Sequence, residues 1–254
     1  MRRSTLLFGS ASIAFGVFAL VPVTIAFLDE LAMLKTEIQV YQVSHAGDFS
    51  ELTQKLEDIA GPQFKDVRES DWFSPYVGSV ASWGIVSGYL YADGTPTGEF
   101  KPSSPVTVAE ALKMVFKAAR MDETQCLRPA LHPHAAGHWA KFYVSCAEEK
   151  GMRLFQGKQI DLNRPVHRGE LLSMMHDAFG DQVLPLYAPF TDTQGHQYEA
   201  DIAYALGRGV VSGDKDIKGN TTGTFRPDAN INRAEVAKIL YTRLKVKVKE
   251  EARV

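Results

Sequence analysis

The sequence predicts a mainly α protein built from three helix-loop-helix repeats. Two stretches carry the same residues at the same internal spacing. Val-Ser-Gly stands at 86–88 and again at 211–213, and Thr-Gly-x-Phe-[Lys/Arg]-Pro follows at 97–102 and at 222–227. After each copy, apolar residues recur at the intervals of a helix with one buried face. One pair of helices cannot bury such a face alone, so we expect the copies to pack into one body.

A third, less regular copy lies between these two. Lys150-Gly151-Met152 matches Trp83-Gly84-Ile85, and the segment 164–170 matches 104–110 and 229–235. We therefore divide the chain into an N-terminal segment at 1–28, a stalk at 29–60, repeats at 61–121, 122–184 and 185–247, and a charged tail at 248–254.

The first helix of each repeat has a readable start or end. Ser74 and Pro75 are typical of a helix start, and Gly84 of a helix end. We expect the corresponding helices over about 138–151 and 197–209, followed by surface loops rich in Gly, Asp and Thr.

The second helix of each repeat begins at a capping sequence. Thr107 and Glu110 form a capping box, in which the hydroxyl accepts from the amide of the third helical residue and the Glu accepts from the amide of the cap residue. Asn232 and Glu235 repeat this spacing, and the second repeat keeps the Glu behind His167.

The N-terminal segment predicts contact with a membrane. After Arg2 and Arg3 no charge occurs before Asp29, and the apolar stretch from Thr5 to Leu28 would reach about 36 Å as a helix, enough to span a bilayer. We expect a signal peptide or an uncleaved transmembrane anchor, with everything after it outside the cytoplasm.

The stalk carries one apolar stripe, which would dock on the repeats or pair with a second chain. Its residues are Phe27, Leu31, Leu34, Ile38 and Tyr41.

The charge and the cysteines restrict the partners and the compartment. A formal net charge of -2 gives no basic field for nucleic acid, so we expect no nucleic-acid partner. Cys126 and Cys146 lie in the part predicted to be exported, where they either form a disulfide or stay as two buried thiols.

Two arginines are candidate anion-binding residues. Arg168 and Arg233 stand at the first helical position after the cap, where the helix dipole disfavours a cation. A bound carboxylate would reverse this, because it could pair with the guanidinium and with the amides at the helix start. We expect both side chains to be exposed. The alternative is a solvated arginine or one paired with a nearby Asp or Glu.

The order of these motifs resembles the S-layer homology (SLH) repeats of bacterial envelope proteins. The first copy has Phe64-Lys65-Asp66-Val67, Trp72, Gly84 to Gly88 and Phe100-Lys101-Pro102, and the third copy runs likewise from Phe190 to Glu235. The resemblance covers Phe64 to about Lys247. It implies a pseudo-threefold helical prism whose grooves bind an anionic, often pyruvylated, secondary cell-wall polysaccharide attached to peptidoglycan.

The resemblance also implies which residues bind. Arg168 and Arg233 match the main anion contact of the family, with His167 and Asn232 where Thr is usual. Val108 departs from the pattern, so we expect two working grooves at most. The candidate ligand-binding residues are Arg168, Arg233, Asn232, Trp72, Trp139, Ser87 and Ser212, although the tryptophans could also serve as core or groove wall and the serines as turn residues.

Other chemistries find little support. The loop from Asp214 to Phe225 lacks the last glutamate of a calcium loop, and the cluster from His132 to His138 is a poor zinc site. No nucleophile elbow occurs. We therefore expect a non-enzymatic protein without metal or cofactor that attaches to the extracytoplasmic envelope, tethered by its N-terminal helix. The alternative is protein assembly by degenerate repeats, in a surface layer or as an envelope adaptor.

Overall fold

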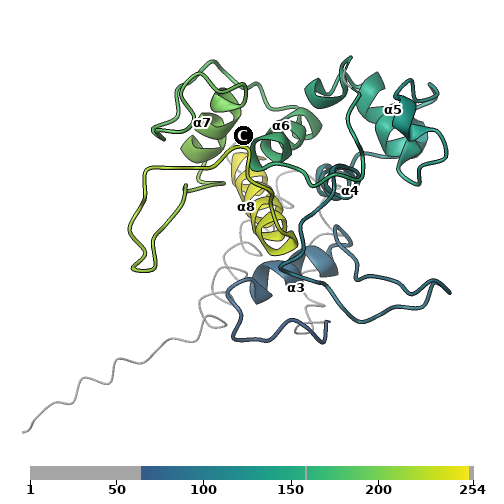
Figure 1. Cartoon of the computed structure of the whole chain (residues 1–254), viewed down its shortest axis with the longest axis horizontal. Coiled ribbons are helices and arrows are strands. Elements are labelled where there is room, and N and C mark those ends of the chain that lie inside the picture. The colour runs from purple at the N-terminus through teal and green to yellow at the C-terminus, as the bar shows by residue number, and fades with distance from the viewer. Residues whose placement is uncertain (1–63, 158, 252–254) are drawn as a thin grey trace, which may run out of the picture.

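The protein is mainly α, as its sequence predicts. A computed structural model describes residues 64–157 and 159–251, and these ranges hold six α-helices, three short 3₁₀ helices and no strand (Figure 1). The α-helices are α3 (Ser74–Ser82), α4 (Val108–Ala119), α5 (Lys141–Glu149), α6 (Arg168–Phe179), α7 (Glu199–Gly207) and α8 (Arg233–Glu251). The 3₁₀ helices are η1 (Glu123–Gln125), η2 (Pro133–Ala135) and η3 (Arg153–Phe155).

The segments 1–28 and 29–60 lie outside the described residues, so the predicted anchor and stalk remain predictions. Among the helices that the structure does describe, none is long and apolar enough to cross a membrane.

The first helices end where the sequence predicts, because a glycine follows each of them in the left-handed conformation. Gly84, Gly151 and Gly209 have φ of 68°, 74° and 71°. At the first of these ends, the Ile85 amide donates back to the Val80 carbonyl and closes the helix. The start differs slightly from the prediction, since Phe73 is the N-cap and makes no side-chain cap bond.

The second helices begin at the predicted capping boxes. Glu110 N–H donates to the Thr107 hydroxyl at 3.2 Å, while the Thr107 amide donates to Glu110 Oε2 at 2.9 Å. Asn232 and Glu235 make the same two bonds at the start of α8. At the start of α6, the His167 amide donates to Glu170.

Three short segments in front of these helices bond to one another in a closed cycle. Val106 N–H donates to the Ile231 carbonyl, Ile231 N–H to the Val166 carbonyl, and Val166 N–H to the Val106 carbonyl, at 3.1, 3.3 and 2.8 Å. All three side chains are fully buried. We call Val106, Val166 and Ile231 the hub, because each repeat contributes one member.

The cycle continues into the helix starts. The first amide of each second helix would lack a partner within its own helix, and here it donates to a carbonyl of another repeat. The three bonds are Val108 N–H to Arg164 O, Arg168 N–H to Ala229 O and Arg233 N–H to Ser104 O, each at 3.0 Å.

The helices follow the same order. Each second helix packs on the first helix of the next repeat: α4 on α5, α6 on α7, and α8 back on α3. Helix α4 also packs against α6 and α8, so the second helices are central, and Figure 1 shows α8 in the middle of the body with α3 across one end. The last helix therefore closes a ring with the first.

The second repeat keeps one anchoring bond with a different side chain. In the first and third repeats an Asp carboxylate accepts from the backbone of the Phe-[Lys/Arg]-Pro turn, and in the second repeat an imidazole does so. The bonds are Phe100 N–H to Asp66 at 2.8 Å, Phe225 N–H to Asp192 at 3.0 Å and Ile160 N–H to His132 Nε2 at 3.0 Å. This bond to the backbone explains why the polar side chain of His132 is buried.

The second repeat also exchanges the sizes of two packed residues. Elsewhere an aromatic ring lies so close to a glycine that an added Cβ would meet it. The pairs are Phe64 with Gly88 and Phe190 with Gly213, at 3.0 and 2.3 Å. The second repeat has Ala130 and the buried Phe155 at these positions, so the aromatic residue stands at the position of the glycine.

A disulfide joins Cys126 to Cys146, which decides between the two states that the sequence left open. It ties the segment before η2 to α5, and this segment carries His132. The sequence separation is 20 residues.

Replacing both cysteines with serine should lower the free energy of unfolding by about 3 kcal/mol, because the unfolded chain loses a closed loop of this size. Urea unfolding of the wild type and the double variant measures the difference. Equal stability would mean that this segment is held by its other contacts alone.

Candidate ligand-binding grooves

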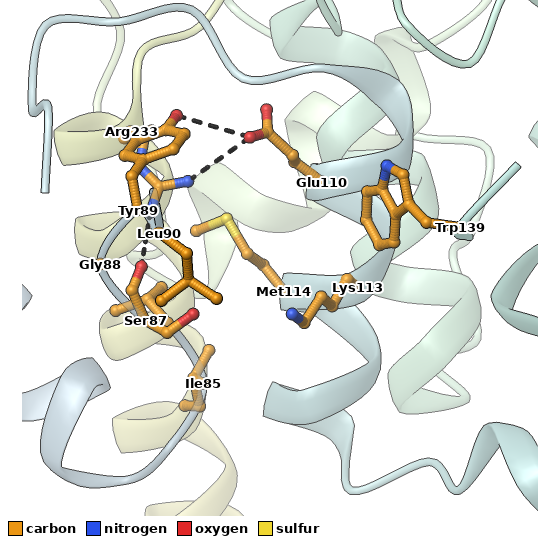
Figure 2. A pocket seen from close by; sticks show the side chains of 11 residues that line it. Ile85, Ser87, Gly88, Tyr89, Leu90, Glu110, Lys113, Met114, Trp139 and Arg233 are labelled. Carbon is orange, nitrogen blue, oxygen red and sulfur yellow. Dashed lines mark hydrogen bonds and ion pairs between the residues drawn. The ribbon is translucent and has the colours of Figure 1, made fainter. Parts of the chain in front are cut away.

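One groove, groove A, is lined by residues of all three repeats. Arg233 comes from the start of α8, Glu110 and Lys113 from α4, and Trp139 from the loop before α5. Figure 2 shows Arg233 and Tyr89 on one side of the hollow and Trp139 on the other. The volume is about 240 Å³.

Arg233 is fixed on several sides. Its Nε donates to the Phe100 carbonyl at 2.8 Å and its Nη2 to the Ser87 carbonyl at 3.0 Å. The guanidinium carbon lies 4.7 Å from the ring centroids of both Tyr89 and Phe100. Nη1 is 3.9 Å from Glu110 Oε1, which is too long for a hydrogen bond. A ligand oxygen could therefore bond to Nη1.

Groove B has the same composition with each repeat's role moved by one. Arg168 comes from the start of α6, Glu235 and Lys238 from α8, and Trp72 from the loop before α3. Its volume is about 500 Å³.

Arg168 is held as Arg233 is. Its Nε donates to the Phe225 carbonyl at 3.0 Å, and its guanidinium carbon lies 4.7 Å from the Phe225 ring centroid. Nη1 is 3.4 Å from Glu235 Oε1, and Nη2 is 4.0 Å from Asp214 Oδ1. Burial lowers the pKa of Arg168, and Glu235 and Asp214 oppose this effect. An arginine stays charged under these conditions.

A lysine lies over an exposed tryptophan in each groove. Lys113 Nζ is 5.9 Å from the Trp139 ring centroid, and Lys238 Nζ is 5.6 Å from the Trp72 ring centroid. The tryptophans are 53% and 49% exposed, so they are groove wall and not core. An acidic sugar can stack on the indole while its carboxylate meets the ammonium.

The sequence interpretation missed these lysines, although a signal existed. Lys113 and Lys238 each follow the capping glutamate by three residues, and the second repeat has Ser173 at this position. This spacing places the lysine beside the glutamate on one helix face.

The remaining candidates differ in their surroundings. Ser87 and Ser212 are exposed and line grooves A and B. Asn232 accepts from Glu235 N–H at 2.9 Å as a helix cap, and it is not among the lining residues of either groove.

The expected exposure of the two arginines is wrong. The Arg168 and Arg233 side chains are 11% and 7% exposed. Both guanidinium groups pack on aromatic rings and bond to backbone carbonyls of the neighbouring repeat, so these residues join the repeats as well as line the grooves.

The interface between the first and second repeats has no arginine from the helix start, because Val108 stands there and is fully buried. At this interface Arg164 pairs with the capping glutamate, Glu170. Its Nη2 and Nη1 donate to Glu170 Oε1 and Oε2 at 2.6 and 2.9 Å. Tyr198 packs so closely on Gly169 that a Cβ there would lie 2.7 Å from its ring.

A partly buried charge network joins α6 and α7 nearby. Arg153 donates to Asp177 Oδ1 and Asp201 Oδ1, each at 2.7 Å, and His176 Nδ1 is 3.1 Å from Asp201 Oδ1. Burial alone would raise the pKa of Asp201, but hydrogen bonds from His176 and Arg153 outweigh it and hold the pKa below its usual value.

Comparison with known proteins agrees with this description. The S-layer homology domain family matches residues 63–90, 189–216 and 217–237, which lie in the first and third repeats. The first and third repeats of the chain are thus similar to S-layer homology domains.

Two relatives are cell-surface proteins by name. The middle cell wall protein of Brevibacillus brevis is 28% identical over 116 residues, which is 45% of this chain and 9% of the relative. Cell surface glycoprotein 1 of Acetivibrio thermocellus is 28% identical over 162 residues, 57% of this chain and 7% of the relative. The chain thus spans under a tenth of either relative. These matches support a location at the cell surface, outside the cytoplasm.

Replacing Arg233 with alanine should lower the free energy of unfolding by about 3 kcal/mol, because the buried Phe100 carbonyl and Glu110 lose their cation. Urea unfolding measures this change. The exposed Lys238→Ala variant is the control and should differ from wild type by less than about 0.5 kcal/mol. Equal stability of the two variants would contradict the structural role of Arg233.

The Asp201→Asn variant should be less stable than wild type at neutral pH, and the difference should shrink as the pH falls below about 4. The sign follows from the lowered pKa of Asp201: its stabilisation is present above the unfolded-state pKa and disappears as the pH falls through the folded-state pKa. Urea unfolding between about pH 7 and pH 3 tests this, and a constant difference would contradict it.

Proposed function

We propose that the protein attaches non-covalently to the bacterial cell envelope by binding an anionic secondary cell-wall polysaccharide in grooves A and B. The observation that carries this proposal is the repeated set of four side chains. Each groove joins an arginine, a glutamate, a lysine and an exposed tryptophan, and the three repeats exchange roles between the grooves. A packing requirement alone does not explain exposed tryptophans at matching positions.

The chemistry of this set suits an acidic sugar. The indole offers an apolar face to the ring, the lysine and the arginine offer charge to a carboxylate, and the glutamate accepts from hydroxyls. We propose that pyruvylation of the sugar supplies the carboxylate. We propose no catalytic activity.

The arrangement would also give avidity. We propose that the cyclic order of the repeats forms the pseudo-threefold prism of the family, with two grooves fixed in one body. Two such sites on one polymer bind more tightly together than either does alone. Retention at a wall therefore does not need a tight single site. The N-terminal segment would add a membrane tether, which rests on its sequence alone.

The test is sedimentation of the full-length chain, in mild detergent, with cell walls of the source organism before and after their anionic polysaccharide is stripped. Binding should disappear with the polysaccharide. Binding that survives stripping would contradict the proposal.

The variant Lys113→Ala with Lys238→Ala should bind intact walls at least about tenfold more weakly, because it loses one charged contact in each groove. The matched control is Lys117→Ala with Lys218→Ala, which removes the same charge from residues that line neither groove. If both variants bind alike, the effect belongs to net charge and the grooves are not the site.

A second candidate function is protein assembly in a surface layer or an envelope complex. Three linker side chains favour it, because they are large, apolar and almost fully exposed: Leu127, Leu131 and Tyr187, at 88%, 86% and 89%. Self-association or complex formation without wall polymer, seen by analytical ultracentrifugation, would support this function instead.

A further inference from the structure

Grooves A and B differ at the lining position next to the arginine and at the position after it, where groove A has Leu90 and groove B has the exposed Lys215. Tyr89 follows Gly88 in the first repeat, and Asp214 follows Gly213 in the third. Both residues line their groove. The two grooves therefore present a different group beside the same cation.

In groove A this group is a neutral phenol. Tyr89 stacks on the Arg233 guanidinium, and its hydroxyl donates to Glu110 Oε1 at 3.4 Å (Figure 2). Burial raises the pKa of Tyr89, so it stays protonated. Among the described residues, Glu110 is the carboxylate that pairs with Arg233, at 3.9 Å.

In groove B the group is a carboxylate. Asp214 Oδ1 lies 4.0 Å from Arg168 Nη2, while Glu235 lies 3.4 Å from Nη1. Hydrogen bonds from Arg226 hold the pKa of Asp214 below its usual value, so it is charged. Arg168 therefore already has two carboxylates beside it before any ligand binds.

A further position differs between the two repeats. Arg226 clamps Asp214 with two bonds of 2.7 and 2.8 Å, and at the matching position Lys101 lies 4.6 Å above the Tyr89 ring. Arg226 offsets part of the charge of Asp214, but its side chain is 60% exposed and does not line the groove, whereas Asp214 is 13% exposed and does. Water screens the exposed cation more than the covered carboxylate.

We propose that this exchange makes the grooves selective for different sugars of the polymer. Groove A takes a sugar that carries a carboxylate, which Arg233 and Lys113 attract without a carboxylate at the position of Tyr89. Groove B takes a neutral sugar, whose hydroxyls donate to Asp214 and accept from Arg168. This inference rests on the proposed function and names the substrate of each groove.

The physical reason is repulsion between like charges. A ligand carboxylate bound at Arg168 would lie within a few ångströms of Asp214, in a partly covered site where charges interact more strongly than in water. Neutral hydroxyls do not meet this penalty, and a carboxylate is a good acceptor for them.

The test isolates each groove by removing its tryptophan. Trp72→Ala leaves groove A intact, and Trp139→Ala leaves groove B intact. The full-length chain in mild detergent is titrated with soluble wall polysaccharide, once native and once with its carboxylates converted to amides. We expect Trp139→Ala to lose at least about fivefold in affinity for native polysaccharide relative to Trp72→Ala, and to bind the amidated form as well as the native form.

A second set of variants then reverses the charge difference between Tyr89 and Asp214. Asp214→Asn in the Trp139→Ala background should raise the affinity for native polysaccharide at least about fivefold, and Tyr89→Asp in the Trp72→Ala background should lower it by a similar factor. Asn keeps the size of Asp214, and circular dichroism checks the folding of all variants. Asp228→Asn is the control, since its carboxylate is 71% exposed and lines neither groove.

The outcomes separate the two proposals. Equal losses in the two tryptophan variants, with no effect of Asp214→Asn beyond the Asp228→Asn control, would overturn the selectivity while leaving polysaccharide binding in place. A wild-type chain that binds neither form of the polysaccharide would overturn the proposed function and this inference with it.

Discussion

The closed cycle of backbone hydrogen bonds at the hub sets the position of everything else in the body. Val106, Val166 and Ile231 each donate to the preceding repeat in the cycle, and each second helix begins two residues later. The start of a helix carries amides without partners, and the cycle supplies carbonyls for them. Because the hub is shared, the first residue of each second helix lies at an interface between repeats. A groove can therefore form only from all three repeats together.

The same constraint gives the two arginines a double role. Arg168 and Arg233 bond to carbonyls of the neighbouring repeat and stack on its phenylalanine, so each closes an interface. Each also presents part of its guanidinium to a groove. A change at either arginine alters stability and binding at once. Lys113 and Lys238 are further from the hub and therefore report on the grooves more directly.

The second repeat shows which interactions the fold must keep. His132 replaces an aspartate as acceptor for a backbone amide, and the aromatic residue of the pair is the buried Phe155, at the position of the glycine. Arg164 pairs with Glu170 at the interface where Val108 stands in place of the arginine. In each case the residue types change and the contact remains. The second repeat is less similar in sequence to the other two because different residue types make its contacts.

The sequence by itself determined the class of the fold, the three repeats and the helix starts and ends. These features depend on neighbours in the chain: Gly84 permits a left-handed turn, and Thr107 with Glu110 satisfies a helix start locally. The repeated position of Arg168 and Arg233 also predicted anion binding, because the spacing was the same twice, and this stays a prediction.

Only the tertiary structure decided how those residues are used. The burial of both arginines and the position of the lysines over the tryptophans depend on contacts between residues of different repeats. A local pattern contains no information about which carbonyl or ring a long side chain will meet across an interface. The difference between Tyr89 and Asp214 is visible in the sequence, but it acquires meaning only when each lies beside an arginine from another repeat.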